Sequence, residues 1–350
     1  MKFGRKSRWF LRTILAVFVA GAALYAWSYW PLSADAELPD PAVTVANEIS
    51  TNGAIYSEGY VESRGHQIHY VTAGEGDPII FLHGFPSYWF TMFGLMDTFG
   101  ADYQVIAIDG LGVGHSDAPT SIEEYRLQGL VADVEAVADH LQLEEFHLVG
   151  HDWGAAIATA MVQDQPERVK TLTAIGALPH NILLERLSVD PEHSEIFSYV
   201  STFSSANPVL IKLLGAGDDI WSNIYAPLYD RGLMPQKQAE RLQADLGDAR
   251  RLDRFINWYR ANIPEFDSIT DDDFWPARGA RISVPALFIY GSEDQVVTEA
   301  LVDDLRASAD SMEVLRFDGV EHRPHFEQKQ ALAEAIRELI ERESASASEL

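Results

Sequence analysis

The stretch Phe146-His-Leu-Val-Gly-His-Asp-Trp-Gly-Ala-Ala156 decides the fold. A short apolar segment ends at Gly150, and a segment of small residues opens after Gly154. Gly-x-Asp-x-Gly between a strand and a helix has the spacing of a nucleophile elbow. The glycines let the chain turn sharply, so Asp152 should be exposed at the edge of a sheet. The dipole of the following helix would keep it ionised. In isolation, Asp152 also fits an ordinary helix cap.

Similar short apolar runs recur on both sides of this stretch. They are typical of strands buried on both faces, and they cover residues 79–82, 105–108, 146–149, 172–175, 286–290 and 314–317. Residues 67–71 alternate and follow Gly65, which indicates a hairpin with the run near Val61. Apolar residues at helical spacing lie between the strands, after a predicted capping box at Ser121 and Glu124. This alternation predicts an α/β fold with a mostly parallel, doubly wound sheet.

The alternation fails between about residues 180 and 275, where the chain is helix-like and rich in aromatic residues. This segment predicts a helical cap that closes a site at the carboxyl ends of the strands. We therefore expect the following organisation: an N-terminal segment 1–34, a linker 35–56, a core in two parts at 57–179 and 276–343, the cap 180–275, and a disordered tail 344–350.

The N-terminal segment differs from the rest of the chain. Five basic residues lie among the first twelve, and residues 13–34 carry no charge. These 22 residues are long enough to form a membrane-spanning helix, and aromatic residues lie at the far end of the segment. We expect a membrane anchor in a lipid bilayer, or alternatively a cleaved signal peptide with a weak site at Ala34 and Ala36. In both cases the remaining chain would lie on the extracytoplasmic side.

Composition excludes several classes of function. The 350 residues carry a formal net charge of -27, which disfavours binding to nucleic acids. The chain has no cysteine, so disulfides, thiolate metal sites and cysteine nucleophiles are excluded. No cofactor motif is present: the glycine-rich loop 109–117 lacks dinucleotide and P-loop spacing and is expected to be structural.

Candidate partners for Asp152 follow in the order nucleophile, acid, histidine. Asp294 comes after a predicted strand and is the expected orienting acid, with Glu293 as its nearest rival. His322 follows the last predicted strand and is the expected base, with His325 as the alternative. A metal site at His322, His325 and Glu327 is not expected, because no HExxH motif exists.

A second loop, His83-Gly-Phe-Pro86, directly follows a predicted strand. In this arrangement the backbone N–H groups of Phe85 and Trp153 would form an oxyanion hole. An aspartate at the elbow also changes the chemistry, because attack by a carboxylate on an sp³ carbon gives an alkyl ester. Water can then hydrolyse that ester, whereas the ether formed by a serine would be stable. An esterase or lipase is therefore disfavoured.

From about Ser57 to Arg342 the chain resembles the epoxide hydrolases of the α/β-hydrolase superfamily. The matching motifs are HGFP at 83–86, GHDWG at 150–154, NWYR at 257–260 and GSED at 291–294. The resemblance implies that two cap tyrosines protonate the epoxide oxygen. NWYR places one at Tyr259, and the segment 197–203 places the other at Tyr199, with Tyr225 and Tyr229 as possible substitutes. One departure is Glu321, where the family usually has glycine.

The resemblance implies hydrolysis of an epoxide to a vicinal diol through an ester on Asp152. Haloalkane dehalogenases share GHDWG and are the alternative, although they usually have a side-chain donor where Phe85 stands. A non-catalytic, membrane-anchored binding protein is a further alternative. Aromatic cap residues indicate a small apolar substrate, and the expected substrate-binding residues are Phe85, Trp153, Tyr225 and Phe255.

Overall fold

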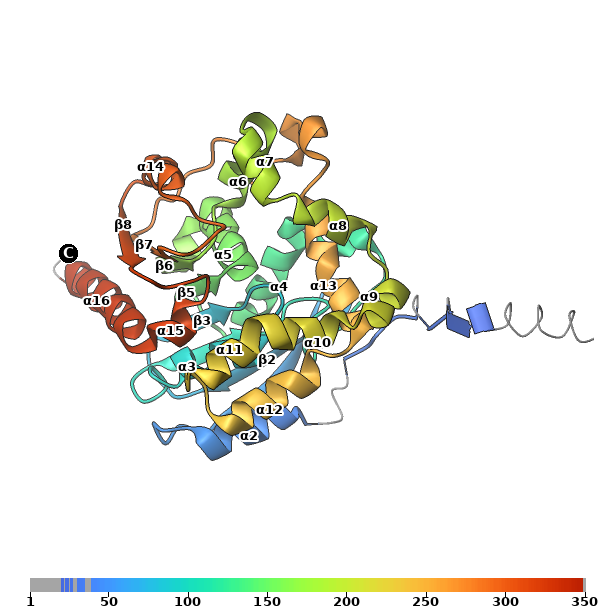
Figure 1. Cartoon of the computed structure of the whole chain (residues 1–350). Coiled ribbons are helices and arrows are strands. Elements are labelled where there is room, and N and C mark those ends of the chain that lie inside the picture. The colour runs from blue at the N-terminus through green and yellow to red at the C-terminus, as the bar shows by residue number, and fades with distance from the viewer. Residues whose placement is uncertain (1–19, 22, 25, 28–29, 35–38, 349–350) are drawn as a thin grey trace, which may run out of the picture.

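The computed structural model describes residues 20–21, 23–24, 26–27, 30–34 and 39–348. Its centre is one eight-stranded sheet in the order β1-β2-β4-β3-β5-β6-β7-β8 (Figure 1). The strands are β1 Ser57–Ser63, β2 His66–Ala73, β3 Pro78–Leu82, β4 Gln104–Ile108, β5 Phe146–His151, β6 Val169–Ile175, β7 Ala286–Gly291 and β8 Met312–Phe317. Strand β2 is antiparallel to both its neighbours, β1 and β4. The other neighbouring strands, in the order β4-β3-β5-β6-β7-β8, pair in parallel. The predicted hairpin and the mostly parallel sheet are confirmed.

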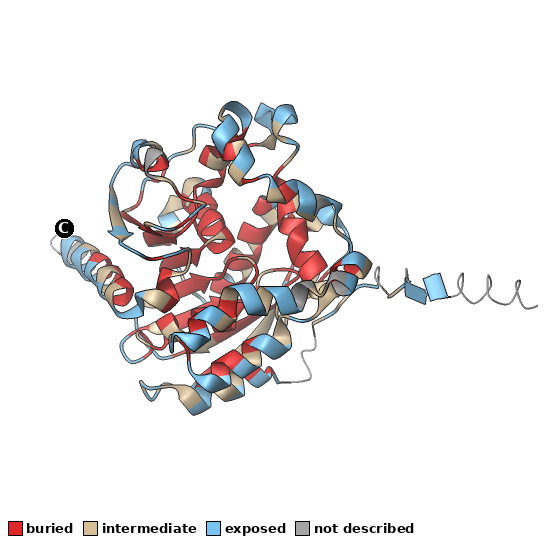
Figure 2. Ribbon diagram, in the orientation of Figure 1, coloured by how far each residue is buried: buried red, intermediate tan, exposed pale blue. Residues whose placement is uncertain are grey.

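Helices cover both faces of the sheet. In the core they are α3 Trp89–Met96, α4 Leu127–His140, α5 Trp153–Asp164, α14 Glu299–Ala307, α15 Pro324–Glu327 and α16 Lys329–Ser348, with short turns η1 Ile122–Tyr125 and η2 Pro166–Arg168. Helix α3 packs against α16, and α4 packs against α5. The central strands are buried between these layers (Figure 2), and every residue of β5 is buried. Burial on both faces explains why these strands are continuous apolar runs.

Between β6 and β7 the described chain forms helices and no strand, as the predicted cap requires. They are α6 His180–Val189, α7 Pro191–Ile196, α8 Tyr199–Ser205, α9 Pro208–Leu214, α10 Ala216–Ile220, the π-helical turn η3 Trp221–Tyr225, α11 Ala226–Asp230, α12 Gln236–Asp245, α13 Ala249–Asn262, η4 Phe266–Ser268 and η5 Asp271–Asp273. Helix α13 joins this cap to the core. The Trp258 indole N–H donates to the carbonyl of Leu111, and Asn262 bonds the backbone of Tyr125 and Leu127.

The predicted linker 35–56 is wrong for its described part. Residues Pro41–Ile49 form helix α2, which packs against α12 and α3 (Figure 1). Asp40 caps this helix by accepting from the N–H of Ala42, Pro41 occupies the first turn, and Ala42 and Ala46 are buried. The sequence pattern did not predict helix α2, because this helix has only nine residues and is stabilised mainly by packing.

The predicted disordered tail 344–350 is also wrong, because α16 continues to Ser348. Serine hydroxyls in this part donate to carbonyls one turn earlier: Ser344 donates to Ile340 and Ser346 to Arg342. Residues 349–350 lie outside the described chain.

The predicted capping box at Ser121 and Glu124 does not form. Residues 122–125 make the 3₁₀ turn η1, and α4 begins only at Leu127. The Ser121 side chain makes no capping bond, and Glu124 instead lies 3.3 Å from His66 and 3.5 Å from Arg64 of the first hairpin. Glu124 therefore pairs with residues that are distant in the sequence and does not cap the helix with Ser121.

The predicted anchor falls largely on residues outside the described chain, which begins at residue 20 and has gaps up to residue 38. Among the described residues, no helix is both long enough and apolar enough to cross a bilayer.

Candidate active site

The elbow is a strained turn between β5 and α5. Asp152 has φ 53° and ψ -123°, a backbone conformation that non-glycine residues rarely adopt. A Cβ on Gly150 or Gly154 would overlap neighbouring backbone atoms, so both positions need glycine for close packing of strand and helix. The turn is held by the N–H of Asp152, which donates to the carbonyl of Ile175 at 2.9 Å.

The structure brings Asp152, Asp294 and His322 together. His322 Nδ1 lies 2.9 Å from Asp294 Oδ2, and its Nε2 lies 3.4 Å from Asp152 Oδ2. These residues come from three segments: the β5–α5 turn, the loop after β7 and the loop after β8. The side chains of Asp152 and His322 are 15% and 18% exposed, whereas that of Asp294 is fully buried. The imidazole is therefore fixed from behind and faces the carboxylate of Asp152.

The two alternatives to these residues lie elsewhere. Glu293 is exposed, and its backbone N–H bonds the carbonyl of Val320. His325 is buried behind the site with its ring 4.3 Å from that of His151, and its Nδ1 has no hydrogen-bond partner. His151 in turn donates from Nε2 to the carbonyl oxygen of His322 at 2.9 Å. This support behind the base was not foreseen, although His151 lies within the GHDWG motif.

Electrostatics hold Asp152 and His322 as an ion pair. Burial by itself would lower the pKa of His322, but the charges and hydrogen bonds of Asp294 and Asp152 outweigh it and raise the pKa to about 9. Burial would likewise raise the pKa of Asp152. The hydrogen bond and charge of His322 and the N–H of Phe85 outweigh it, so that the pKa lies below its ordinary value. Glu321 does not disturb the contact of His322 with Asp294. The side chain of Glu321 is exposed, and its backbone N–H donates a hydrogen bond to the carboxylate of Glu327.

The loop after β3 contacts the nucleophile directly. The N–H of Phe85 donates to Asp152 Oδ1 at 2.6 Å. A Cβ on Gly84 would overlap Asp152, so this close approach depends on glycine. One of the two predicted oxyanion donors thus already points at the reacting carboxylate. The other, the N–H of Trp153, begins helix α5 immediately after Asp152.

Both predicted cap tyrosines lie above Asp152. A small cavity of about 40 Å³ is lined by Asp152, Trp153, Tyr199 and Tyr259, with apolar side chains that include Phe197. The rings of the two tyrosines meet edge to face with their centroids 6.1 Å apart, and burial raises the pKa of both hydroxyls. They therefore stay protonated in the free protein and can donate a proton into the cavity.

The predicted substrate-binding residues do not all line this cavity. Trp153 does, whereas Phe85 packs edge to face on Tyr259 and Phe255, with ring centroids 5.2 and 4.9 Å away. Phe255 lines a separate cavity of about 300 Å³ between the cap and the core. Tyr225 does not line the cavity at Asp152: its hydroxyl donates to the carbonyl of Pro86 at 2.9 Å. The remaining substitute, Tyr229, is 36% exposed.

The NWYR motif contributes more than the predicted tyrosine. Arg260 bonds Asn257 and the carbonyl of Ala206, which ties α13 to the end of α8. Tyr199 and Tyr259 come from these two helices. The motif itself was the available signal for this positioning, but its partner Ala206 lies more than fifty residues away in the sequence.

With this geometry established, comparison with known proteins identifies the class. The family model for the alpha/beta hydrolase fold matches residues 77–329, and the chain belongs to this family. Epoxide hydrolase 4 of Mus musculus is 39% identical over 122 residues, which cover 34% of this chain and 34% of the mouse protein. This match therefore spans about a third of its length.

Other similarities extend further along the chain. Epoxide hydrolase 3 of Xenopus tropicalis is 27% identical over 288 residues, which cover 79% of this chain and 74% of the frog protein. The crystal structure of an epoxide hydrolase from Bacillus megaterium superposes with a TM-score of 0.71. It is 22% identical and covers 81% of this chain and all of that structure. At this identity the superposition shows the shared fold.

Proposed function

We propose that this protein hydrolyses an epoxide to a vicinal diol through a covalent ester on Asp152. One observation carries the proposal: the carboxylate of Asp152 faces His322, which is held by the buried Asp294, and it shares a cavity with Tyr199 and Tyr259. The proposal is further supported by the similarity to proteins named epoxide hydrolase 3 and 4.

In the first step, Asp152 attacks one epoxide carbon and the carbon–oxygen bond breaks. The developing alkoxide is a poor leaving group unless it is protonated, and an alkoxide is more basic than a phenolate. Tyr259 or Tyr199 therefore supplies the proton. The carboxylate attacks with Oδ2, because Oδ1 accepts the hydrogen bond from Phe85.

In the second step, the ester no longer carries the negative charge of Asp152. His322 then loses one of the two groups that raise its pKa and releases its proton, which returns to the tyrosinate left by the first step. The neutral imidazole can now accept a proton from water. Asp294 stabilises the imidazolium that forms. The hydroxide attacks the carboxyl carbon, and the oxyanion is stabilised by the N–H of Phe85 and, in our proposal, of Trp153. When this intermediate collapses, the bond between the carboxyl carbon and the substrate oxygen breaks, and the leaving alkoxide takes the proton from His322 to give the diol. The carboxylic acid of Asp152 then passes its proton to His322, which restores the ion pair.

A single turnover in heavy-oxygen water tests the covalent route. With enzyme in excess over an aryl epoxide, the heavy oxygen should enter the carboxylate of Asp152 and be absent from the diol. Mass spectrometry of the peptide that contains Asp152 and of the diol measures both. Heavy oxygen in the diol, with none in the peptide, would contradict the ester.

The haloalkane alternative is tested with the same preparation. A departing halide needs hydrogen-bond donors but no proton, and here the residue after Gly84 is Phe85, which offers only its backbone N–H. We expect epoxide turnover and no halide release from a panel of haloalkanes. Halide release without epoxide turnover would favour a dehalogenase, and an unreactive protein would favour the binding protein.

We also propose that the N-terminal segment anchors the protein in a bilayer with the catalytic part on the extracytoplasmic side. Support comes from the sequence, in which a basic cluster precedes 22 uncharged residues. Membranes from expressing cells should retain the protein after alkaline carbonate washing, and its intact mass should include the first 34 residues. A shortened, freely released chain would instead show signal cleavage.

A further inference from the structure

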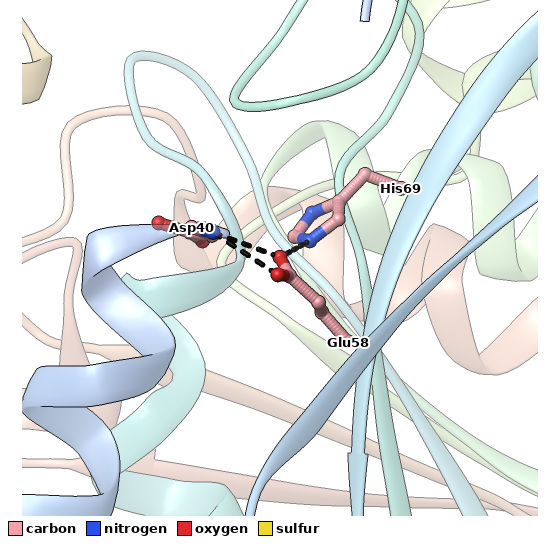
Figure 3. A group of neighbouring side chains, drawn as sticks. All are labelled: Asp40, Glu58 and His69. Atoms are coloured by element: carbon pink, nitrogen blue, oxygen red, sulfur yellow. Dashed lines mark hydrogen bonds and ion pairs between the residues drawn. The ribbon is translucent and has the colours of Figure 1, made fainter. Parts of the chain in front are cut away.

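A second group of charged side chains lies away from the active site, where α2 meets the first hairpin. Asp40 precedes α2, Glu58 lies on β1 and His69 on β2. The backbone N–H of Asp40 and Nε2 of His69 both face the carboxylate of Glu58 (Figure 3). One ligand atom from each lies within 4.8 Å of the other two. The side chains of Asp40 and His69 are fully buried, and that of Glu58 is 20% exposed.

The ring of His69 is held with one nitrogen turned toward Asp109 and the other toward Glu58. Its Nδ1 lies 2.8 Å from the buried carboxylate of Asp109, and its Nε2 lies 3.1 Å from Glu58 Oε2. Asp109 is itself fixed, because it accepts from the backbone N–H groups of Trp89 and His115. A buried carboxylate on the far nitrogen is the usual support of a metal-binding histidine, because it fixes the ring and raises its basicity.

Both carboxylates keep lone pairs that a cation can use. Glu58 accepts the N–H of Asp40 with both oxygens at 3.1 Å, so one oxygen can leave while the other keeps the bond. The oxygens of Asp40 accept from the N–H of Ala42 and the indole N–H of Trp89, and each retains a second lone pair. A cation would therefore displace only the proton on Nε2 of His69.

We propose that Asp40, Glu58 and His69 bind a divalent transition-metal ion of the zinc type, with His115 as a fourth ligand. His115 Nε2 lies 3.3 Å from Asp40 Oδ1, its side chain is 25% exposed, and its ring centroid lies 5.3 Å from that of His69. Neighbouring ligand atoms of tetrahedral zinc are about 3.3 Å apart, given bonds of about 2.0 Å. The separations of 3.1 Å between His69 Nε2 and Glu58 Oε2 and of 3.3 Å between the His115 and Asp40 atoms are close to this spacing.

The ligand set selects the kind of ion. Imidazole nitrogen together with carboxylate oxygen suits zinc and its neighbours, whereas magnesium and calcium prefer oxygen ligands alone. The proposed ligands lie at residues 40, 58, 69 and 115, so they form no short sequence motif. The lack of an HExxH motif is therefore no argument against a metal ion at this site.

The bound ion would link the start of helix α2 to strands β1 and β2 of the sheet. Helix α2 begins at Pro41, directly after Asp40, and it packs against α12 of the cap. A ligand that binds only the folded state raises its stability, so the metal should raise the melting temperature. This inference is independent of the proposed reaction, because none of its ligands touches Asp152.

The test uses the full chain in detergent, stripped with a chelator and then titrated with Zn²⁺, with Mg²⁺ as the comparison. We expect one zinc per chain by elemental analysis, a higher melting temperature with Zn²⁺ and none of this response with Mg²⁺. Co²⁺ should give the visible absorption of a four-coordinate ion. Absence of stoichiometric zinc, or an equal response to Mg²⁺, would overturn the proposal.

Two matched variants locate the ion. Glu58→Gln keeps an oxygen for the N–H of Asp40 and should weaken zinc binding by at least about tenfold, since even supporting residues contribute that much. Glu62→Gln makes the same charge change at an exposed position on the same strand and should bind like the wild type. His115→Ala should weaken binding and alter the cobalt spectrum. Unchanged zinc binding by Glu58→Gln would place any bound ion elsewhere and refute the site.

Discussion

Replacing the nucleophile should change the protonation of the histidine that faces it. Asp152→Asn removes a negative charge 3.4 Å from His322 Nε2 while keeping the size of the side chain. Two unit charges at that distance interact by about 5 kcal/mol at an effective dielectric constant of about 20, and by about 1 kcal/mol in bulk water. One pKa unit corresponds to about 1.4 kcal/mol. The pKa of His322 should therefore fall from about 9 by at least about one pH unit.

Histidine-labelled protein followed by NMR between about pH 5 and pH 10 measures this change, because the window spans the ordinary and raised pKa. The spectrum of His322→Gln assigns the signal. Asp190→Asn is the matched control, since Asp190 lies 2.9 Å from Nδ1 of a different histidine, His193. It should leave His322 unchanged. An unaltered pKa in Asp152→Asn, or an equal fall in Asp190→Asn, would refute the reasoning.

The same perturbation has a consequence for stability. In the wild type, the folded pKa of His322 lies above its ordinary value of 6.5. Its contribution to the free energy of unfolding is therefore complete below pH 6.5 and is lost as the pH rises through about 9. In Asp152→Asn this loss should occur at lower pH. Alkylation also neutralises Asp152, so a confirmed fall would show how ester formation prepares the base for the second step.

Three further variants test the tyrosines, the elbow and the joint between cap and core. Tyr259→Phe should reduce the rate of ring opening by about 10²-fold or more, as removal of a general acid does, while Tyr229→Phe at an exposed cap position should not; single-turnover kinetics distinguish them. Gly154→Ala places a Cβ against the backbone of β3 and should abolish the cooperative thermal transition near the wild-type temperature. Asn262→Ala removes three hydrogen bonds from the Asn262 side chain to backbone groups and should lower the free energy of unfolding in urea by about 1–3 kcal/mol. Asn223→Ala removes one exposed hydrogen bond and should lower it little.

Much of the fold followed from the local pattern. Strands buried on both faces are continuous apolar runs, so β3 to β7 could be recognised singly, and the helical insert was visible as a break in their alternation. The edge strand β8 was also predicted at residues 314–317, although its residues are only partly buried or exposed. Two of the errors share one cause. Helix α2 and the start of α4 depend on contacts with distant residues, such as the pairing of Glu124 with Arg64, which no short window contains. The end of α16 instead has local bonds from serine hydroxyls to carbonyls one turn earlier, which the small polar residues of the tail did not indicate.

The sequence alone determined the kind of nucleophile and the order of its partners, because an elbow motif and two loops after strands mark themselves by glycine and strand ends. Only the tertiary structure decided which side chains meet. It set the 3.4 Å between His322 and Asp152, brought the rings of Tyr199 and Tyr259 edge to face, and directed the hydroxyl of Tyr225 to a backbone carbonyl. It also gathered the charged group at Asp40, whose members lie too far apart in the chain for spacing to relate them. Hydrogen bonds and charges act over a few ångströms in space, so distances along the chain carry no information about them until the fold is formed.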